Sequence, residues 1–170
     1  MKRTLILMRH GKSDWGPEFV RDFDRPLRPR GQRAAARMGR WLRENALVPD
    51  VLVTSTAKRA WQTALLVQPE VELPCESLIR DERIYDASLQ SLLYTIAEHG
   101  GERARLMLIG HNPGFDYLVM HLSAVLPALT ANGKLMTTAA VAVLESGSAW
   151  DALGQGCCAQ ASVTRPRELE

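Results

Sequence analysis

Three separate segments of this 170-residue sequence carry the residue types that phosphate chemistry needs. Arg9 and His10 are adjacent, Arg59 lies much further along the chain, and His111 follows later with Asn112 beside it. Arginine can hold phosphate oxygens through two parallel hydrogen bonds, and a neutral imidazole is a competent nucleophile. If the fold brings these residues together, they predict a pocket for a dianion in which a phosphoryl group passes to His10.

Short apolar runs precede these residues and predict the strands that position them. Residues 4–8 lead directly to His10, residues 51–53 lead towards the helix that carries Arg59, and residues 106–109 lead to His111. In parallel sheets, ligands bind beyond the carboxyl ends of the strands. The sequence therefore predicts that the polar groups meet at one edge of the sheet.

Helical spacing of apolar residues predicts helices between these strands. Pro29 is expected to open the first helix, Ser55 or Thr56 to cap the second, Ser88 to cap the third, and Gly100 to stop it. The predicted helices are 29–46, 57–67, 89–99 and 114–122. A further strand is expected at 139–144, another to begin at Trp150, and a short edge strand within 69–74.

This alternation of strands and helices predicts an α/β fold in which a mostly parallel sheet is covered on both faces. The length argues for a single domain over residues 1–170. Hydrophobic residues make up 46% and charged residues 24% of the chain, and the net charge is only +2. Such a charge gives no indication of a nucleic acid or membrane partner, and anion binding must be local.

The three cysteines form no disulfide framework, and no apolar run is long enough to span a membrane. These features predict a cytoplasmic protein. The sequence also lacks the His-Glu-x-x-His and Cys-x-x-Cys patterns of metal sites and any phosphate-binding loop motif. Because arginines can stabilise charge on a phosphoryl group, no metal or other cofactor is expected.

Taken together, these motifs resemble the histidine phosphatase superfamily, which includes the cofactor-dependent phosphoglycerate mutases. Residues 7–11 resemble its Arg-His-Gly signature, and residues 59–64 resemble its Arg-Ala-x-Gln-Thr-Ala helix start. Residues 110–114 resemble the second histidine motif of the short phosphohistidine phosphatases of the SixA type, as do residues 24–27 and 137–139. Where the family usually has Ser-Pro before its helix, this sequence has Ser-Thr.

The resemblance implies a three-layer α/β/α sandwich of the phosphoglycerate mutase type and a role for each matching residue. His10 would accept the phosphoryl group, Arg9 and Arg59 would hold the phosphate, and His111 would stabilise the transition state. The resemblance further implies a metal-independent enzyme. Asn112, next to the second histidine, is expected to help bind phosphate.

A carboxylic acid is also needed to protonate the leaving group and then to activate water. Residues 81–85 are similar to the Asn-Glu-Arg-His-Tyr of the mutases, which makes Glu82 the expected acid. Asp22 and Asp24 lie in the loop after the nucleophile. They could line the mouth of the site or pair with neighbouring arginines.

The short chain leaves little room for the insertions that cover the site in larger members of this superfamily, so an open site is expected. An open site suits a phosphorylated protein, such as a phosphohistidine carrier, and the sequence favours this substrate. A small phosphoester is the alternative, with the same mechanism. A non-catalytic phosphate-binding module is a third possibility. Arg33, Arg37 and Arg40 share one helical face, which is either solvated or a docking surface for an acidic partner.

Overall fold

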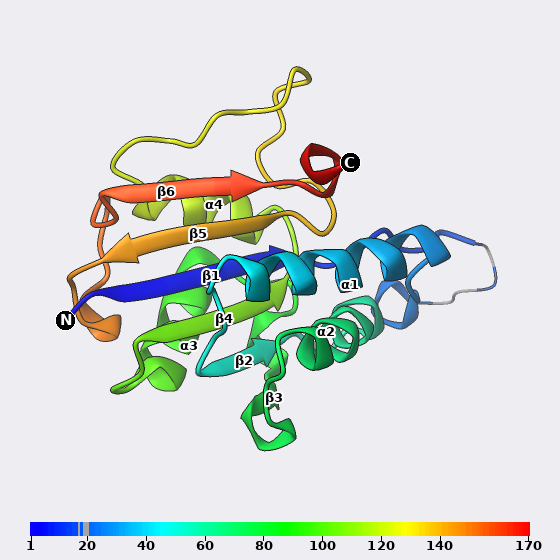
Figure 1. The fold of residues 1–170 in the computed structure, drawn as a ribbon, viewed down its shortest axis with the longest axis horizontal. Coiled ribbons are helices and arrows are strands. Elements are labelled where there is room, and N and C mark those ends of the chain that lie inside the picture. The colour runs from blue at the N-terminus through cyan, green and yellow to red at the C-terminus, as the bar shows by residue number, and fades with distance from the viewer. Residues whose placement is uncertain (17, 19–20) are drawn as a thin grey trace.

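The computed structural model describes residues 1–16, 18 and 21–170. Its centre is a six-stranded sheet in the order β3-β2-β4-β1-β5-β6 (Figure 1). The strands are β1 (Arg3–Arg9), β2 (Val51–Thr54), β3 (Leu78–Arg80), β4 (Arg105–Gly110), β5 (Val141–Ser146) and β6 (Gln160–Thr164). Strands β3, β2, β4 and β1 run parallel, whereas β5 and β6 join antiparallel at one side. The predicted α/β class with a mostly parallel sheet is confirmed.

Two pairs of helices cover the two faces of the sheet. Helices α1 (Pro29–Glu44) and α2 (Lys58–Glu70) lie on one face, and α3 (Leu89–Gly100) and α4 (Gly114–Leu122) lie on the other (Figure 1). Successive side chains of a strand point to opposite faces. Accordingly, Leu5 and Leu7 of β1 pack in the cluster with α3 and α4, while Ile6 and Met8 pack in the cluster with α1 and α2. The expected three-layer α/β/α sandwich is therefore present.

Most of the predicted helix ends agree with the structure. Helix α1 begins at Pro29, whose fixed φ angle suits the first helical position. The hydroxyl of Ser88 accepts a hydrogen bond from the Ser91 backbone N–H and caps α3. That helix ends at Gly100, and Gly101 follows with a φ of 51°, a conformation that glycine adopts readily.

The predicted cap of α2 is wrong, because the residue at the cap position is Ala57, which has no capping hydroxyl. Ser55, two residues before it, instead accepts a hydrogen bond from the Ala57 backbone N–H. The hydroxyl of Ser55 therefore lies at the carboxyl edge of the sheet, where it also contacts the ring of His111.

Two strand predictions at the periphery are also wrong. Trp150 lies in a short 3₁₀ helix rather than a strand, because its buried indole packs against Gly100 and donates a hydrogen bond to the Arg103 carbonyl. The last strand is β6, which begins ten residues later at Gln160. The short edge strand is β3 rather than a segment within 69–74, since α2 continues to Glu70.

The carboxyl ends of β1, β2 and β4 meet at one edge. The His10 backbone N–H donates to the Gly110 carbonyl, which joins the end of β1 to the end of β4. The Ser55 N–H donates to the carbonyl of Ile109, which joins β2 to the same place. A Cβ on Gly11 would lie 2.6 Å from the carbonyl oxygen of Gly31, so only glycine lets the loop after His10 pass so close to α1.

None of the helices in the described part of the chain is both long and apolar enough to cross a membrane.

Candidate active site

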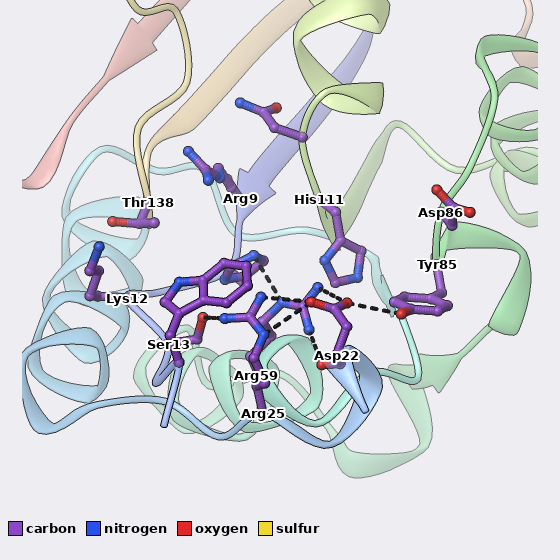
Figure 2. Close-up of a pocket in the computed structure, with 13 residues that line it drawn as sticks. Arg9, Lys12, Ser13, Asp22, Arg25, Arg59, Tyr85, Asp86, His111 and Thr138 are labelled. Carbon is purple, nitrogen blue, oxygen red and sulfur yellow. Dashed lines mark hydrogen bonds and ion pairs between the residues drawn. The ribbon is translucent and has the colours of Figure 1, made fainter. Parts of the chain in front are cut away.

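A hollow of about 420 Å³ opens at the edge where β1, β2 and β4 end. Figure 2 shows the side chains that line it, which come from separate segments of the chain. We call it the His10 hollow. The predicted residues that line it are Arg9, His10, Arg59, His111 and Asn112. Among the residues predicted to act in catalysis or to bind phosphate, only Glu82 is absent from its lining.

The orientation of the His10 ring is set by a hydrogen bond to the backbone. Its Nδ1 lies 2.7 Å from the carbonyl oxygen of Gly11, which can only accept, so Nδ1 carries the proton. The lone pair is then on Nε2, and the Nε–H of Arg59 donates to this atom at 3.2 Å. The nitrogen suited to nucleophilic attack is therefore beside the guanidinium that would hold a phosphoryl group.

His10 remains neutral at physiological pH. Burial lowers its pKa and outweighs the hydrogen bond to Gly11, and the positive side chains of Arg59 and Arg9 lower it further, to about 2. The sequence predicted this direction from the arginines alone, but burial is the largest cause. A neutral imidazole has a free lone pair, which nucleophilic attack requires.

The second histidine is held by the hydroxyl of Ser55. His111 Nε2 lies 2.7 Å from Ser55 Oγ, which also accepts the N–H of Ala57. The Ser55 hydroxyl can donate its proton to Nε2, and the ring proton of neutral His111 is then on Nδ1. Nδ1 is buried and has no hydrogen-bond partner within the described ranges. Since a buried donor without a partner is costly, this atom fits a missing acceptor such as a phosphate oxygen.

Burial lowers the pKa of His111 to about 3, with a further contribution from the nearby positive charge of Arg59. The His10 and His111 ring centroids are 5.2 Å apart. Two histidines this close are compatible because both are neutral. A phosphoryl group in the hollow would therefore lie near the Nε2 of His10, which Arg59 contacts, and near the ring of His111.

Asp22 holds the Arg59 guanidinium in place (Figure 2). Arg59 Nη1 donates to the Asp22 carbonyl at 2.8 Å, and Nη2 donates to the Asp22 carboxylate at 3.0 Å. Arg25 and Tyr85 bind the same carboxylate, at 3.0 and 2.9 Å. These contacts fix the guanidinium plane and leave its Nε edge directed at His10.

Asp22 was expected either to line the mouth of the site or to pair with neighbouring arginines. It does both, since it lines the hollow and pairs with Arg25 and Arg59. Asp24 instead binds Arg21, and it does not line the hollow. Burial by itself would raise the pKa of Asp22, but hydrogen bonds from Tyr85 and Arg25 and the charge of Arg59 lower it to about 2. Asp22 is therefore ionised and cannot serve as a proton donor at neutral pH.

Arg9 and Asn112 are tied to the same backbone group. Arg9 Nη1 and Asn112 Nδ2 donate to the Met136 carbonyl at 3.1 and 3.0 Å. The other end of the Asn112 amide accepts the Asp116 N–H, so this side chain positions the loop before β5. Arg9 lines the hollow, and its Nε is buried and has no partner among the described residues.

Glu82 is exposed, in the short 3₁₀ helix Glu82–Ile84. The carboxylates that line the hollow are those of Asp22 and Asp86, neither of which was the predicted acid. Asp86 is exposed at the mouth. The sequence motif around Glu82 indicated the right neighbourhood, since Tyr85 from the same segment does line the hollow.

One group of possible metal ligands is found among the described residues, and it lies outside the His10 hollow. It comprises Asp81, Glu98 and His99, and we call it, with Arg83, the Asp81 cluster. Arg83 already binds the carboxylates of Asp81 and Glu98, each at 2.5 Å. Its guanidinium therefore neutralises the charge that would attract a cation.

Sequence reasoning did not assign seven further lining residues to the site: Lys12, Ser13, Trp15, Arg25, Tyr85, Asp86 and Thr138. The first three closely follow the Arg-His-Gly motif, so their nearness to His10 in sequence was the available signal. Thr138 belongs to the segment that carried a family resemblance, but no role had been attached to it.

Known proteins match this chain over most of its length. The sequence profile of the histidine phosphatase superfamily (branch 1) matches residues 5–89. An uncharacterized protein of Mycobacterium tuberculosis is 33% identical over 164 residues, which cover 94% of this chain and all of that protein. The chain therefore belongs to the histidine phosphatase superfamily.

Two solved structures are similar over most of the chain. A protein of Nakamurella multipartitia, provisionally named phosphohistidine phosphatase SixA, is 26% identical with a TM-score of 0.76, and the match covers 95% of each chain. A protein of Agrobacterium tumefaciens with the same provisional name is 27% identical with a TM-score of 0.68, over 85% of this chain and 92% of that one. The fold is thus the phosphoglycerate mutase-like fold of SixA-type proteins, and family and neighbours together support a phosphatase.

Proposed function

We propose that this chain is a metal-independent phosphohistidine phosphatase that forms a phosphoenzyme intermediate on His10. The observation that carries the proposal is the state of the His10 ring. Its Nδ1 is bound to the Gly11 carbonyl, and its Nε2 lone pair lies in the hollow beside Arg59. A neutral ring with its lone pair on Nε2 is the state that nucleophilic attack on a phosphoryl group requires.

In the first step, the Nε2 lone pair of His10 forms a bond to phosphorus while the bond to the leaving group breaks and the leaving group keeps the electron pair. Charge on the phosphoryl oxygens is stabilised by Arg59, by Arg9 Nε and by the Nδ1–H of His111. The last two are buried donors without a partner in the described structure. Such preorganised donors are effective because they need no rearrangement during the reaction.

In the second step, a water molecule attacks phosphorus and the bond to His10 breaks, which returns the lone pair to Nε2 and releases inorganic phosphate. The water proton passes to the released phosphate or to a carboxylate at the site. Asp22 is ionised and can accept a proton, although its depressed pKa makes it a weak base. Its main contribution is to orient Arg59.

The acid requirement favours phosphohistidine as the substrate. An alkoxide leaving group needs a proton donor, yet the predicted acid Glu82 does not line the hollow, and Asp22 is ionised. An imidazole leaving group makes a smaller demand for an acid in the enzyme, because its second nitrogen can take a proton from water before the bond to phosphorus breaks, and the ring then leaves as neutral imidazole. The exposed residues Lys12, Trp15 and Asp86 at the mouth also fit a site that admits a side chain on a protein surface.

The test compares the wild-type protein with His10→Ala on two substrates, a carrier protein phosphorylated on histidine and p-nitrophenyl phosphate, with a chelator present. His99→Ala serves as the matched control, because it removes a histidine from the Asp81 cluster. We expect rapid loss of phosphohistidine, slow ester hydrolysis, and dependence of both on His10 but not on His99.

Efficient ester hydrolysis with an untouched carrier protein would instead favour a small-molecule phosphomonoesterase of the same mechanism. Activity that survives His10→Ala, or that disappears with the chelator, would contradict the mechanism. Phosphate binding without turnover on either substrate would indicate a non-catalytic module.

A further inference from the structure

Trp15 lines the His10 hollow and is 72% exposed. Tryptophan side chains usually bury most of their large surface in a folded protein. An exposed indole at the mouth of a polar pocket can therefore serve to bind a ligand, provided that the ring is held in place.

The indole is held from one side by Arg25. The guanidinium carbon of Arg25 lies 3.4 Å from the centroid of the Trp15 ring, which is a close cation–π contact. Arg25 is itself buried and donates to Ser13 Oγ at 2.7 Å and to the Asp14 carbonyl at 3.1 Å. One face of the indole thus rests on a fixed support, although Trp15 as a whole is largely exposed.

Tyr85, the other large aromatic residue in the lining, is already engaged. Its ring packs edge-on against His111 and Phe23, and its hydroxyl donates to Asp22. Tyr85 therefore belongs to the framework that holds Arg59. Trp15 is the aromatic surface that remains available at the mouth.

The position of Trp15 matches the place of a leaving group. The donors for a phosphoryl group lie at the inner end of the hollow, where Arg59 and His111 are buried. The group that carries the phosphoryl must point outwards to leave, and Trp15 lines that open side. A braced aromatic ring binds a planar partner at a low entropic cost, because its rotamer is already fixed.

We propose that Trp15 is a specificity-determining residue that stacks against a planar leaving group during phosphoryl transfer to His10. The imidazole of phosphohistidine and a phenyl ring are both of this kind. The proposal rests on the phosphoryl transfer proposed above, and it adds which part of the substrate is recognised and by which residue.

The first test measures equilibrium binding of two stable analogues, phenylphosphonate and methylphosphonate, by calorimetry. Both carry the same charged group, and only the first has a ring. Stacking of aromatic rings contributes roughly 0.5–1.5 kcal/mol. We therefore expect Trp15→Leu to weaken phenylphosphonate binding roughly three- to tenfold and to leave methylphosphonate binding unchanged, while Trp15→Phe retains most of the preference.

Trp61→Leu is the matched control. Trp61 also lies under an arginine, with the Arg80 guanidinium 4.3 Å from its ring centroid, but it does not line the hollow. Its substitution removes an equivalent tryptophan–arginine pair elsewhere in the chain. We expect it to leave the ratio of the two phosphonate affinities unchanged.

The second test separates the two half-reactions by rapid quenching with p-nitrophenyl phosphate. The leaving group is present only in the first half-reaction. Trp15→Leu should therefore slow formation of the phosphoenzyme and leave hydrolysis of the phosphoenzyme unchanged. A purely structural role for Trp15 would alter both steps.

Equal affinity of the wild-type protein for the two phosphonates, or equal losses for both in Trp15→Leu, would overturn the stacking role. Slower hydrolysis of the phosphoenzyme in Trp15→Leu would do the same. Failure of the proposed function would look different. Activity would survive His10→Ala, or the phosphohistidine carrier would stay intact although the wild-type protein still bound phenylphosphonate more tightly than methylphosphonate through Trp15.

Discussion

The His10 hollow and the Asp81 cluster use the same residue types in different ways. In the Asp81 cluster, every charge has a partner: Arg83 binds Asp81 and Glu98, and His99 Nε2 lies 2.8 Å from the Asp81 carboxylate. In the hollow, by contrast, His111 Nδ1 and Arg9 Nε are buried without a partner in the described structure.

The difference separates a structural ion-pair network from a site prepared for a ligand. Buried polar atoms normally find hydrogen-bond partners, so leaving two of them free lowers stability unless a ligand completes them. The carboxylate that does enter the hollow, Asp22, binds the outer side of Arg59 and leaves the Nε edge to His10. Substitutions made in parallel at the two places can test this comparison.

The largest effect is expected from His10→Gln. Removing the nucleophile should lower kcat/KM by about a thousandfold or more and abolish the phosphoenzyme. His99→Gln, the same change in the Asp81 cluster, should leave both intact. Steady-state kinetics together with detection of acid-labile protein-bound phosphate measures this, and equal losses in the two variants would erase the distinction.

Arg59→Lys should lower kcat/KM by roughly a hundredfold, since lysine keeps the charge but not the planar donors that hold both Asp22 and a phosphoryl oxygen. Arg83→Lys should leave kcat/KM unchanged and lower the free energy of unfolding by about 1 kcal/mol. Urea denaturation and kinetics on the same samples decide between these outcomes. A hundredfold loss in Arg83→Lys would mean that the Asp81 cluster acts on the site.

Ser55→Ala should lower kcat about tenfold, because His111 loses the hydrogen bond that keeps its proton on Nδ1. Ser91→Ala is the matched change next to the other cluster, where the hydroxyl binds the Arg83 carbonyl, and it should leave kcat unchanged. The tautomer can be read directly from the ¹⁵N chemical shifts of His111. An unchanged tautomer in Ser55→Ala would remove the reason for the predicted loss.

The last effect concerns stability rather than catalysis, and it is expected in the pH dependence of unfolding. The pKa of His10 is about 2 in the folded protein, against 6.5 for an ordinary histidine, so its contribution is present above about pH 6.5 and is lost as the pH falls below that value. The pKa of Asp81 is also lowered, by hydrogen bonds from Arg83, so its contribution is lost only below about 3.8. Each group changes the free energy of unfolding by at most about 1.4 kcal/mol per pH unit.

Urea denaturation between pH 7 and pH 3 therefore distinguishes the two groups. His10→Gln should reduce the slope from about pH 6.5 downwards and leave the part due to His111, whose pKa is lowered to about 3, whereas Asp81→Asn should reduce the slope only in the most acidic part. If the free energy of unfolding falls equally steeply in His10→Gln and in the wild-type protein between about pH 6.5 and 4, then His10 is not buried in its neutral form.

Much of the site could be predicted from sequence because its residues directly follow strands. His10 and His111 each end an apolar run, and parallel strands bring such ends to one edge whatever their order in the sheet. Arg59 followed from the same reasoning, since it lies in the first turn of the helix after β2. These predictions needed only local pattern and the general rule for α/β sheets.

The less successful predictions concern segments whose position depends on distant contacts. Trp150 was expected in a strand but packs against Gly100 of α3, which no local pattern shows. Glu82 was expected in the site from its motif, whereas the hollow instead receives Asp22, whose loop lies against α2 and reaches Arg59.

The sequence by itself determined the family, the alternating elements and the four residues Arg9, His10, Arg59 and His111 at the sheet edge. Only the tertiary structure decided that the lone pair of His10 is on Nε2, because the Gly11 carbonyl binds Nδ1, and that Nε2 of His111 contacts the Ser55 hydroxyl. It also decided the antiparallel entry of β5 and β6. The physical reason is that hydrogen-bond geometry and burial arise from contacts between segments far apart in the chain, which spacing along the sequence does not specify.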